Sequence, residues 1–348
     1  MAVTAPRFAR AVVFHAPRDL RIEDVPLPAV AAGDLLLRIT ACGLCPGEVM
    51  DWYVARKAPV PLGHEAVGEV VQAGAGAPYR TGDRVFVHHH APCLACRACR
   101  RGDYVQCAAW RPRRLIPGGL ATYAVANARA VAHDTLVVPP EVSDEVATFI
   151  EPLACVVKSL RRAAPRRGDR VLVLGAGVMG LLHLMLVRAR YEPSQVIAAD
   201  RVPARLEAAA RYADAVVDAG SVPLADGIRE VSGGDGADVV VVGPGTVDAL
   251  NAAMACTAPG GTLVVFTPAP PDARWPLPVH DVFFREITVV PSYSAGPPDT
   301  REALALLRAG LPVETLITHR LSLAEAAHGY DLVRAAGPAL KVIVRPLA

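Results

Sequence analysis

Lysine is nearly absent from this sequence. Lys57, Lys158 and Lys341 are its only lysines, and the other 33 of the 36 basic residues are arginine. This bias is typical of GC-rich codon usage or of a thermophilic source, and the sequence does not separate the two. Basic and acidic residues nearly balance, with a formal net charge of +2. That balance excludes the strongly basic character of a nucleic-acid-binding protein and indicates no preference for acidic partners.

Long apolar runs are missing as well. The longest ones are strand-like and too short to cross a bilayer, so no membrane-spanning segment is expected. Residues 1–10 contain no apolar core of an export signal. Eight cysteines without such a signal favour a reducing cytoplasm. With 348 residues, of which 52% are hydrophobic, the chain is expected to fold into about two domains with real cores.

Four of the cysteines are spaced C-x2-C-x2-C-x7-C. A thiolate cluster this dense suits one tetrahedral Zn²⁺ held in a short loop. Disulfides are the first alternative, but the thiols are too crowded for two easy bridges. An iron–sulfur cluster is the second, because four thiolates also suit iron. Four protein ligands leave no open coordination position, so the sequence predicts a structural zinc. Its ligands are Cys93, Cys96, Cys99 and Cys107.

A second metal site can be assembled from three separated segments. Cys45, His64 and Glu151 offer sulfur, nitrogen and oxygen donors, the set of three that a catalytic zinc with one open position requires. Glu65 is expected to be a fourth ligand or a carboxylate that exchanges with water. Cys155, one helical turn beyond Glu151, is an alternative third ligand. Each segment alone is weak, and the prediction depends on their joint occurrence around the cysteine cluster.

A nucleotide-binding fingerprint follows. An apolar strand is expected at 170–174 and a helix at 181–189, and the turn between them reads G-x-G-x-x-G. Glycines let such a turn close and let the backbone approach a pyrophosphate at the helix N-terminus. Asp200 ends the next predicted strand, 195–199, and is placed to bind the ribose 2′-hydroxyl of NAD. Later parallel strands are expected at 239–242 and 262–266. The turn residues are Gly175, Ala176, Gly177, Val178, Met179 and Gly180.

The sequence resembles the zinc-dependent medium-chain alcohol, polyol and threonine dehydrogenases, because it contains four of their motifs in the same order and spacing. These motifs are G-H-E at residues 63–65, the cysteine cluster, E-P-L at residues 151–153 and the glycine turn. The resemblance implies an α/β protein, with a GroES-like, β-rich catalytic domain (residues 1–152 and 293–348) and a Rossmann doubly wound parallel-sheet NAD-binding domain (153–292). It also implies a homodimer or homotetramer with two zinc ions per chain.

The activity that the resemblance implies is oxidation of a secondary alcohol or polyol to its ketone, with hydride transfer to NAD. An L-threonine, amino-alcohol or sugar dehydrogenase is the alternative. A zinc-free enoyl or quinone reductase of the same superfamily would lack the cysteine cluster and the G-H-E segment. A non-catalytic nucleotide-binding zinc protein would not need the intact set of Cys45, His64 and Glu151.

Further cofactor contacts are expected from the same resemblance. Lys341 is expected to face the pyrophosphate and Arg205 to lie near the adenine ribose. Asp200 favours NAD over NADP, although Arg201 is placed to pair with a 2′-phosphate. Loops that end two later strands are expected to hold the nicotinamide carboxamide. These loops contain Gly243, Pro244 and Thr267.

The chain departs from the family where a proton relay is usual. Many relatives place Ser or Thr two residues after the metal-binding cysteine, and alcohol dehydrogenases have a nearby histidine. Here these positions are Gly47 and Met50, so the usual hydroxyl relay is missing. Glu48 is expected to support His64 from behind. Proton exit is then predicted to use a metal-bound water with Glu65 or Glu151, or a histidine.

His88, His89 and His90 supply the candidate histidines. They follow a predicted strand at 84–87, and in relatives the positions of His89 and His90 line the substrate pocket. If the strand continued, His88 and His90 would point to one side and His89 to the other. Trp52 and Tyr53 are placed to form an aromatic wall.

Overall fold

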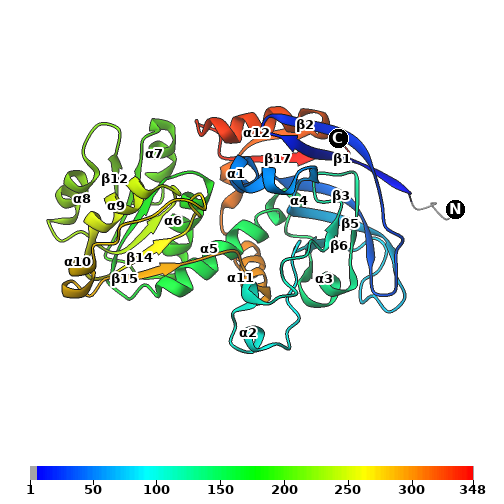
Figure 1. The fold of residues 1–348 in the computed structure, drawn as a ribbon, viewed down its shortest axis with the longest axis horizontal. Helices are drawn as coiled ribbons and strands as arrows, with labels where there is room; N and C mark the ends of the chain where they lie inside the picture. The colour runs from blue at the N-terminus through cyan, green and yellow to red at the C-terminus, as the bar shows by residue number, and fades with distance from the viewer. Residues whose placement is uncertain (1–5, 348) are drawn as a thin grey trace. The chain divides into compact units, whose positions relative to one another are not determined.

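The structure is a computed structural model that describes residues 6–347. Within it the chain folds into two compact units. Unit 1 continues to Ala154 and resumes at Ala295, and unit 2 spans Cys155–Ser294 (Figure 1). The sequence placed the two boundaries after residues 152 and 292, two residues earlier in each case. Within residues 6–347, no helix is both long and apolar enough to cross a membrane.

Unit 1 is built on two sheets. The larger has eight strands, with the path β16-β17-β3-β5-β6-β9, and β7 and β8 join it through β3. The smaller sheet has the order β2-β1-β4. The strands are β1 Phe8–Ala16, β2 Asp19–Pro26, β3 Leu35–Gly43, β4 Val60–Pro61, β5 Glu65–Ala73, β6 Arg84–Val87, β7 Leu115–Ile116, β8 Tyr123–Ala126, β9 Thr135–Val137, β16 Ile317–Ser322 and β17 Lys341–Arg345.

The register of the central strands brings two sequence motifs together. Strand β3 pairs with β17, β5 and β8 and contributes Leu35, Leu37 and Ile39 to a buried apolar core. In the antiparallel β3–β5 pair, Gly43 at the end of one strand lies opposite Glu65 at the start of the other. The Cys45 segment and the G-H-E segment therefore leave the sheet at the same end.

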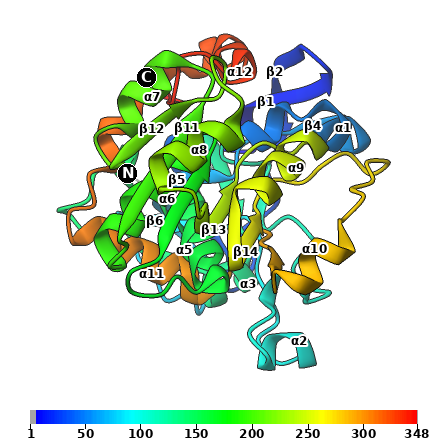
Figure 2. The same cartoon turned by 90° about the vertical axis from the view of Figure 1, so that its left-hand side faces the viewer.

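Apart from α5, α11 and α12, the helices of unit 1 are short. Helix α2 lies in the cysteine-rich loop, which projects from the rest of unit 1 in both views (Figures 1 and 2). Helix α5 begins in unit 1 with Glu151 in its first turn and continues into unit 2. The helices are α1 Asp51–Val54, α2 Arg97–Arg100, α3 Ala128–His133, α4 Asp144–Ala147, α5 Ile150–Ala163, α11 Pro297–Arg308 and α12 Ala326–Ala335.

Unit 2 is a parallel six-stranded sheet with the order β12-β11-β10-β13-β14-β15 (Figure 2). Numbered within the unit, this is the 3-2-1-4-5-6 order of doubly wound dinucleotide-binding folds, so the predicted α/β fold class is confirmed. Strand order reverses between β10 and β13. The strands are β10 Arg170–Leu174, β11 Gln195–Asp200, β12 Ala215–Asp218, β13 Ala237–Val242, β14 Thr257–Val265 and β15 Thr288–Pro291.

Apolar side chains cover both faces of the central strands of this sheet, as expected where helices pack on each side. Val171, Leu172 and Val173 of β10 are fully buried, and Val239, Val240 and Val241 of β13 are at most 2% exposed. The predicted strand at 170–174 has the observed bounds, and the helix predicted at 181–189 begins three residues earlier. The helices are α6 Val178–Arg190, α7 Pro203–Ala209, α8 Leu224–Ser232, α9 Val247–Cys256 and α10 Val279–Phe284.

Candidate functional site

The four clustered cysteines converge on one point. Their sulfur atoms all lie within 4.8 Å of one another. Cys99 Sγ is 3.9 Å from Cys93 Sγ and 3.6 Å from Cys96 Sγ. Zn–S bonds of about 2.3 Å in a tetrahedron place sulfurs about 3.8 Å apart. The cluster therefore fits a zinc ion and not a disulfide.

Backbone N–H groups and a small apolar core surround this cluster. Backbone N–H groups of Ala95 and Cys96 are the main reason why the pKa of Cys93 is lowered to about 6. The N–H of Cys93 in turn donates to Cys107 Sγ at 3.3 Å. A separate small core, which includes the fully buried Trp110, supports the loop. Backbone donors thus favour the thiolate form of Cys93, whereas burial raises the pKa of the Cys99 thiol to about 12.

A second group of potential ligands lies beside the β3–β5 end. One ligand atom each of Cys45, His64 and Glu65 lies within 4.8 Å of the other two. Cys45 is the N-cap of a 3-10 turn, and its sulfur accepts from the backbone N–H of Gly47 at 3.3 Å. This sulfur, nitrogen and oxygen donor set fits a zinc ion. Burial raises the pKa of the Cys45 thiol when no cation is present.

Glu48 contacts Nδ1 of His64 and so supports this side chain, as the sequence predicted. Its Oε1 lies 2.8 Å from His64 Nδ1 and also accepts from the backbone N–H of Gly63 at 2.8 Å. Its Oε2 accepts from the Tyr330 hydroxyl. Burial alone would raise the pKa of Glu48, but the charge of His64 and these hydrogen bonds outweigh it, so the pKa is lowered. The ionised carboxylate fixes the tautomer and leaves Nε2 of His64 for a metal.

Lys341 forms an ion pair that the sequence does not predict. Its ammonium is buried against Glu65 Oε2, and its expected position facing the cofactor pyrophosphate stays a prediction. Both side chains are 1% exposed. A buried ammonium requires a charged partner, and Glu65 is the carboxylate that the β3–β5 register brings to it. Lys341 therefore contacts the metal-binding region of unit 1 through its ion pair with Glu65.

The histidine run departs from the expected alternation because β6 ends at Val87. His88 is fully buried, and its Nδ1 lies 2.7 Å from Asp134 Oδ2. The His89 ring instead packs against His64, with centroids 4.8 Å apart, and against His90 at 4.0 Å. His89 therefore lies beside the candidate ligand His64, and His90 packs against His89.

Glu151 belongs to a different group from Cys45 in this structure. One of its carboxylate oxygens lies within 4.8 Å of a ring nitrogen of His88 and of His89. Glu151 is only 6% exposed. Its charge nevertheless acts on Cys45 and Glu65, whose pKa values it helps to raise. The role of Glu151 as a catalytic-zinc ligand stays a prediction.

Sequence reasoning missed three side chains that organise this region. Tyr330 lies 282 positions from Glu48, to which its hydroxyl donates. Thr300 lies 166 positions from Asp134, and its hydroxyl donates to Asp134 Oδ1 at 2.5 Å. No motif or spacing marks Tyr330, Thr300 or Asp134, because only the packing of α11 and α12 brings them to their partners.

In unit 2, the glycine turn has the geometry that the fingerprint requires. Gly175 has a φ of +88°, which favours glycine, and a Cβ at Gly180 would clash with the Gly175 carbonyl. Gly177 is the N-cap of α6 and offers no side chain to cap it. Val178 and Met179 form the first turn of α6. The backbone N–H groups at this helix start are therefore free of side-chain capping and fit a phosphate.

Asp200 lies at the end of β11 and reaches the glycine turn. Its Oδ2 accepts from the N–H of Ala176 at 2.6 Å, and its Oδ1 accepts from those of Arg201 and Val202 at 2.7 and 2.9 Å. Arg205 Nη1 lies 4.0 Å from Oδ2 of Asp200. A carboxylate has about four lone-pair sites, so one remains for a ribose hydroxyl. These residues fit a nicotinamide dinucleotide.

The loops expected to hold the nicotinamide end strands of this sheet. Gly243 follows β13, and its N–H donates to the Leu174 carbonyl at 2.9 Å. Pro244 lies against Gly175, with its Cδ 3.3 Å from the position of a Cβ there. Thr267 follows β14, and its Cγ2 lies 3.1 Å from the Cβ position of Gly245. The loops thus gather at the point where strand order reverses, the usual ligand position in such sheets.

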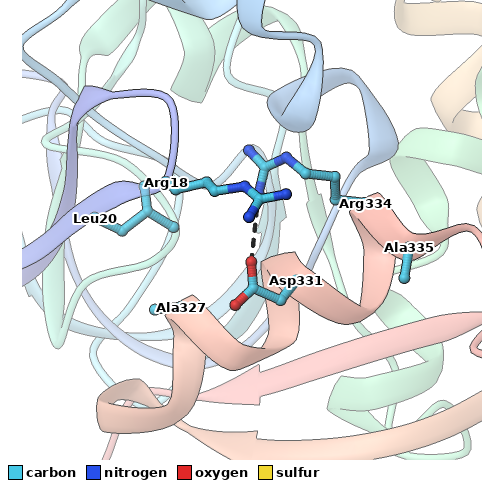
Figure 3. A pocket seen from close by; sticks show the side chains of 6 residues that line it. All are labelled: Arg18, Leu20, Ala327, Asp331, Arg334 and Ala335. Atoms are coloured by element: carbon cyan, nitrogen blue, oxygen red, sulfur yellow. Dashed lines mark ion pairs between the residues drawn. The ribbon is translucent and has the colours of Figure 1, made fainter.

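A surface pocket of about 370 Å³ lies elsewhere in unit 1, between α12 and the turn that joins β1 to β2 (Figure 3). Asp331 forms an ion pair with Arg334 at 3.5 Å, and Arg334 also contacts Asp51 at 3.3 Å. None of the predicted site residues lines this pocket. The lining residues are Arg18, Leu20, Ala327, Asp331, Arg334 and Ala335.

Comparison with known proteins places both units in one family. Residues 31–139 match the alcohol dehydrogenase GroES-like domain, and residues 179–309 match the zinc-binding dehydrogenase domain. Erythritol/L-threitol dehydrogenase of Mycolicibacterium smegmatis is 31% identical over 99% of this chain and 100% of its own length.

Solved structures agree with this assignment. Alcohol dehydrogenase TADH from Thermus sp. ATN1 is 29% identical and has a TM-score of 0.86 over 97% of this chain and 99% of its own. A zinc-binding dehydrogenase from Sinorhizobium meliloti bound to NADP is 27% identical, with a TM-score of 0.84 over 97% and 99%. The chain therefore belongs to the zinc-dependent medium-chain dehydrogenase superfamily and is an oxidoreductase of the alcohol/polyol dehydrogenase type.

Proposed function

We propose that this enzyme uses NAD to interconvert a polyol, or another secondary alcohol, and its ketone. The observation that carries the proposal is the triad of Cys45, His64 and Glu65, with His64 held by the buried Glu48. It is joined in the same chain to a glycine turn that contacts the Asp200 carboxylate. One unit offers a metal-binding donor set, and the other offers a dinucleotide-binding turn.

Two zinc ions per chain are part of the proposal. The four clustered cysteines would hold a structural ion. Cys45 and His64 would hold the catalytic one, with carboxylate oxygens from Glu65 and Glu151. When bound there, zinc lowers the pKa of an alcohol hydroxyl by acting as a Lewis acid.

The chain's own residues then have to move the hydroxyl proton. Gly47 and Met50 carry no group that can accept it. His89 packs on His64 and has a ring nitrogen that is buried without a hydrogen-bond partner in the described chain, and the same holds for His90. We assign to this pair either transfer of the proton or recognition of a polar substrate, and we favour recognition.

NAD is proposed over NADP because of Asp200. A negatively charged carboxylate repels a 2′-phosphate and accepts a hydrogen bond from a 2′-hydroxyl. Arg201, which is exposed, and Arg205 are positive charges that soften this preference. The 27% identical relative from Sinorhizobium meliloti is bound to NADP, so the family includes proteins that take this cofactor.

A polyol is the favoured substrate because the 31% identical relative acts on erythritol and L-threitol. The polar ring nitrogens of His89 and His90 beside the metal-binding triad suit a substrate with several hydroxyls. His90 occupies the position of a pocket histidine in threonine dehydrogenases. An amino alcohol such as L-threonine, or a sugar, is therefore the second candidate.

Assembly into a homodimer or homotetramer and a cytoplasmic location complete the proposal. Three apolar side chains of α10 are strongly exposed: Val279 at 71%, Phe283 at 72% and Phe284 at 70%. They precede β15, which is the edge strand of its sheet. An exposed apolar group beside an unpaired edge favours a second copy of the chain. Zinc–thiolate sites favour a reducing compartment.

Metal analysis and a substrate screen test the proposed function. Purified enzyme should contain at least two zinc ions per chain and should reduce NAD⁺ with at least one polyol, amino alcohol or 2-alkanol. His64→Ala should abolish turnover while the fold persists. A fully zinc-loaded enzyme that turns over none of these substrates with NAD⁺ or NADP⁺ would contradict the proposal.

A further inference from the structure

Two histidines in unit 1 are held in the same way. His64 Nδ1 lies 2.8 Å from Glu48 Oε1, and His88 Nδ1 lies 2.7 Å from Asp134 Oδ2. In each pair, the second carboxylate oxygen accepts a hydrogen bond from a buried hydroxyl. A carboxylate in this position fixes the Nδ1–H tautomer and leaves Nε2 as an acceptor, the arrangement typical of a metal-ligating histidine.

His64 has an evident use for its second nitrogen, but His88 does not. The His88 side chain is fully buried, and its Nε2 has no hydrogen-bond partner among the described residues. The neighbouring His89 Nδ1 is buried without a partner as well. Native proteins rarely leave such atoms unsatisfied, so these atoms, together with the equally unpartnered His90 Nδ1, indicate a bound ion or water in the cluster.

The groups around His88 complete a ligand set. A ring nitrogen of His88, a ring nitrogen of His89 and a carboxylate oxygen of Glu151 all lie within 4.8 Å of one another. Two imidazoles and one carboxylate are a known set for a divalent transition metal and occur at zinc sites with one open position. The Glu151 carboxylate supplies the negative charge that a buried cation needs.

We propose that His88, His89 and Glu151 form an additional zinc site next to the catalytic one. The two positions adjoin through His89 and His64, whose ring centroids are 4.8 Å apart. Paired catalytic metals in proteins lie about 3.5–4 Å apart. Glu151 has two oxygens and can serve both positions. Asp134 and Thr300 position His88 without touching the metal.

Zinc stoichiometry of the intact enzyme tests this site. After equilibrium dialysis against excess Zn²⁺, wild-type protein should bind one ion more than His88→Gln or His89→Gln. His89→Gln leaves the buried contact between His88 and Asp134 in place, so it tests the site even if His88→Gln fails to fold. His90→Gln is the matched control, because His90 belongs to the same ring cluster but not to the ligand set.

Cobalt separates this site from the other two. With Co²⁺ in place of zinc, both cysteine-containing sites should show thiolate-to-metal charge transfer, and the additional site should add only weak d–d bands. Those bands should persist in Cys45→Ser and vanish in His89→Gln. A wild-type protein that saturates at two ions, or a third ion that survives both histidine variants, would overturn the proposal. Absence of turnover with intact metal counts would contradict the proposed function alone.

Discussion

The ammonium of Lys341 forms an ion pair with the carboxylate of Glu65, and both side chains are 1% exposed. These residues lie 276 positions apart, and β17 and β5 bring them to the end of one sheet. Glu65 also belongs to the group of Cys45 and His64. A buried cation thus contacts a candidate metal ligand directly and neutralises its charge when no metal is present.

Lys341→Met should destabilise the protein strongly. It leaves the Glu65 carboxylate buried without its partner, and removal of one member of a buried pair costs about 3–5 kcal/mol. Urea unfolding at neutral pH measures the change. Lys57→Met is the control, because Lys57 is exposed and only contacts the Tyr53 ring, so its loss should cost less than about 1 kcal/mol. Equal losses in the two variants would show that the ion pair is not stabilising.

The two predicted zinc ions should be separable by mutation. Cys96→Ser should lose the structural ion and lower the melting temperature, because a structural zinc contributes folding free energy directly. His64→Ala should lose the other ion and retain a melting temperature close to that of the wild type. Zinc analysis combined with calorimetry distinguishes them. The prediction fails if both variants melt alike or if either retains the full zinc content.

Glu48→Gln should weaken zinc binding at the catalytic position. Loss of the carboxylate behind a ligating histidine typically costs about 10–100-fold in metal affinity or activity. Tyr330→Phe should have a smaller effect in the same direction, because Tyr330 acts on Glu48 and not on His64. Chelator competition gives the affinities. Tyr79→Phe removes a hydroxyl that donates only to the Thr135 carbonyl and should leave zinc binding unchanged.

Cofactor choice should depend on Asp200. We expect the wild type to prefer NAD⁺ over NADP⁺ by about tenfold in kcat/KM, which corresponds to one charge-assisted interaction of about 1.4 kcal/mol. Asp200→Ser should abolish or reverse that preference. Asp218→Ser is a matched control, since Asp218 lies opposite Asp200 on β12 and caps its own turn. Equal wild-type values for the two cofactors would mean that Asp200 does not recognise the ribose.

His183 should make stability fall in acid. Burial lowers its pKa from 6.5 to about 4, with Nε2 3.0 Å from Ser159 Oγ and Nδ1 2.8 Å from the Met179 carbonyl. The unfolded chain takes up the proton at a higher pH than the native one. This contribution is therefore intact above pH 6.5 and is lost progressively towards pH 4, by about 3 kcal/mol in total.

A variant isolates this effect from the protonation of other groups. Urea unfolding of the wild type and of His183→Gln, both zinc-loaded, should be compared at pH values above and below this interval. The wild-type advantage should shrink as the pH falls. A difference between the two proteins that does not change with pH would assign the acid sensitivity to other residues.

The local motifs were readable from the sequence because they depend on short-range chemistry. The cysteine spacing puts four sulfurs in one loop, and the observed sulfur separations suit one zinc ion. The apolar run at 170–174, followed by glycines that tolerate positive φ, specifies a strand and a tight turn before a helix. The contact between Glu48 and His64 was also predictable, because Glu48 belongs to the same short segment as Cys45.

Contacts between distant segments were decided by the tertiary structure alone. Tyr330, Thr300 and Asp134 reach their partners only because helices and strands far apart in sequence pack together, and no local pattern encodes that packing. The ion pair of Lys341 with Glu65 is another such contact, because the cost of burying an unpaired charge requires a partner that no local pattern names. The histidine run left its strand at Val87, so the alternation rule did not apply, and His88 turned inward to Asp134.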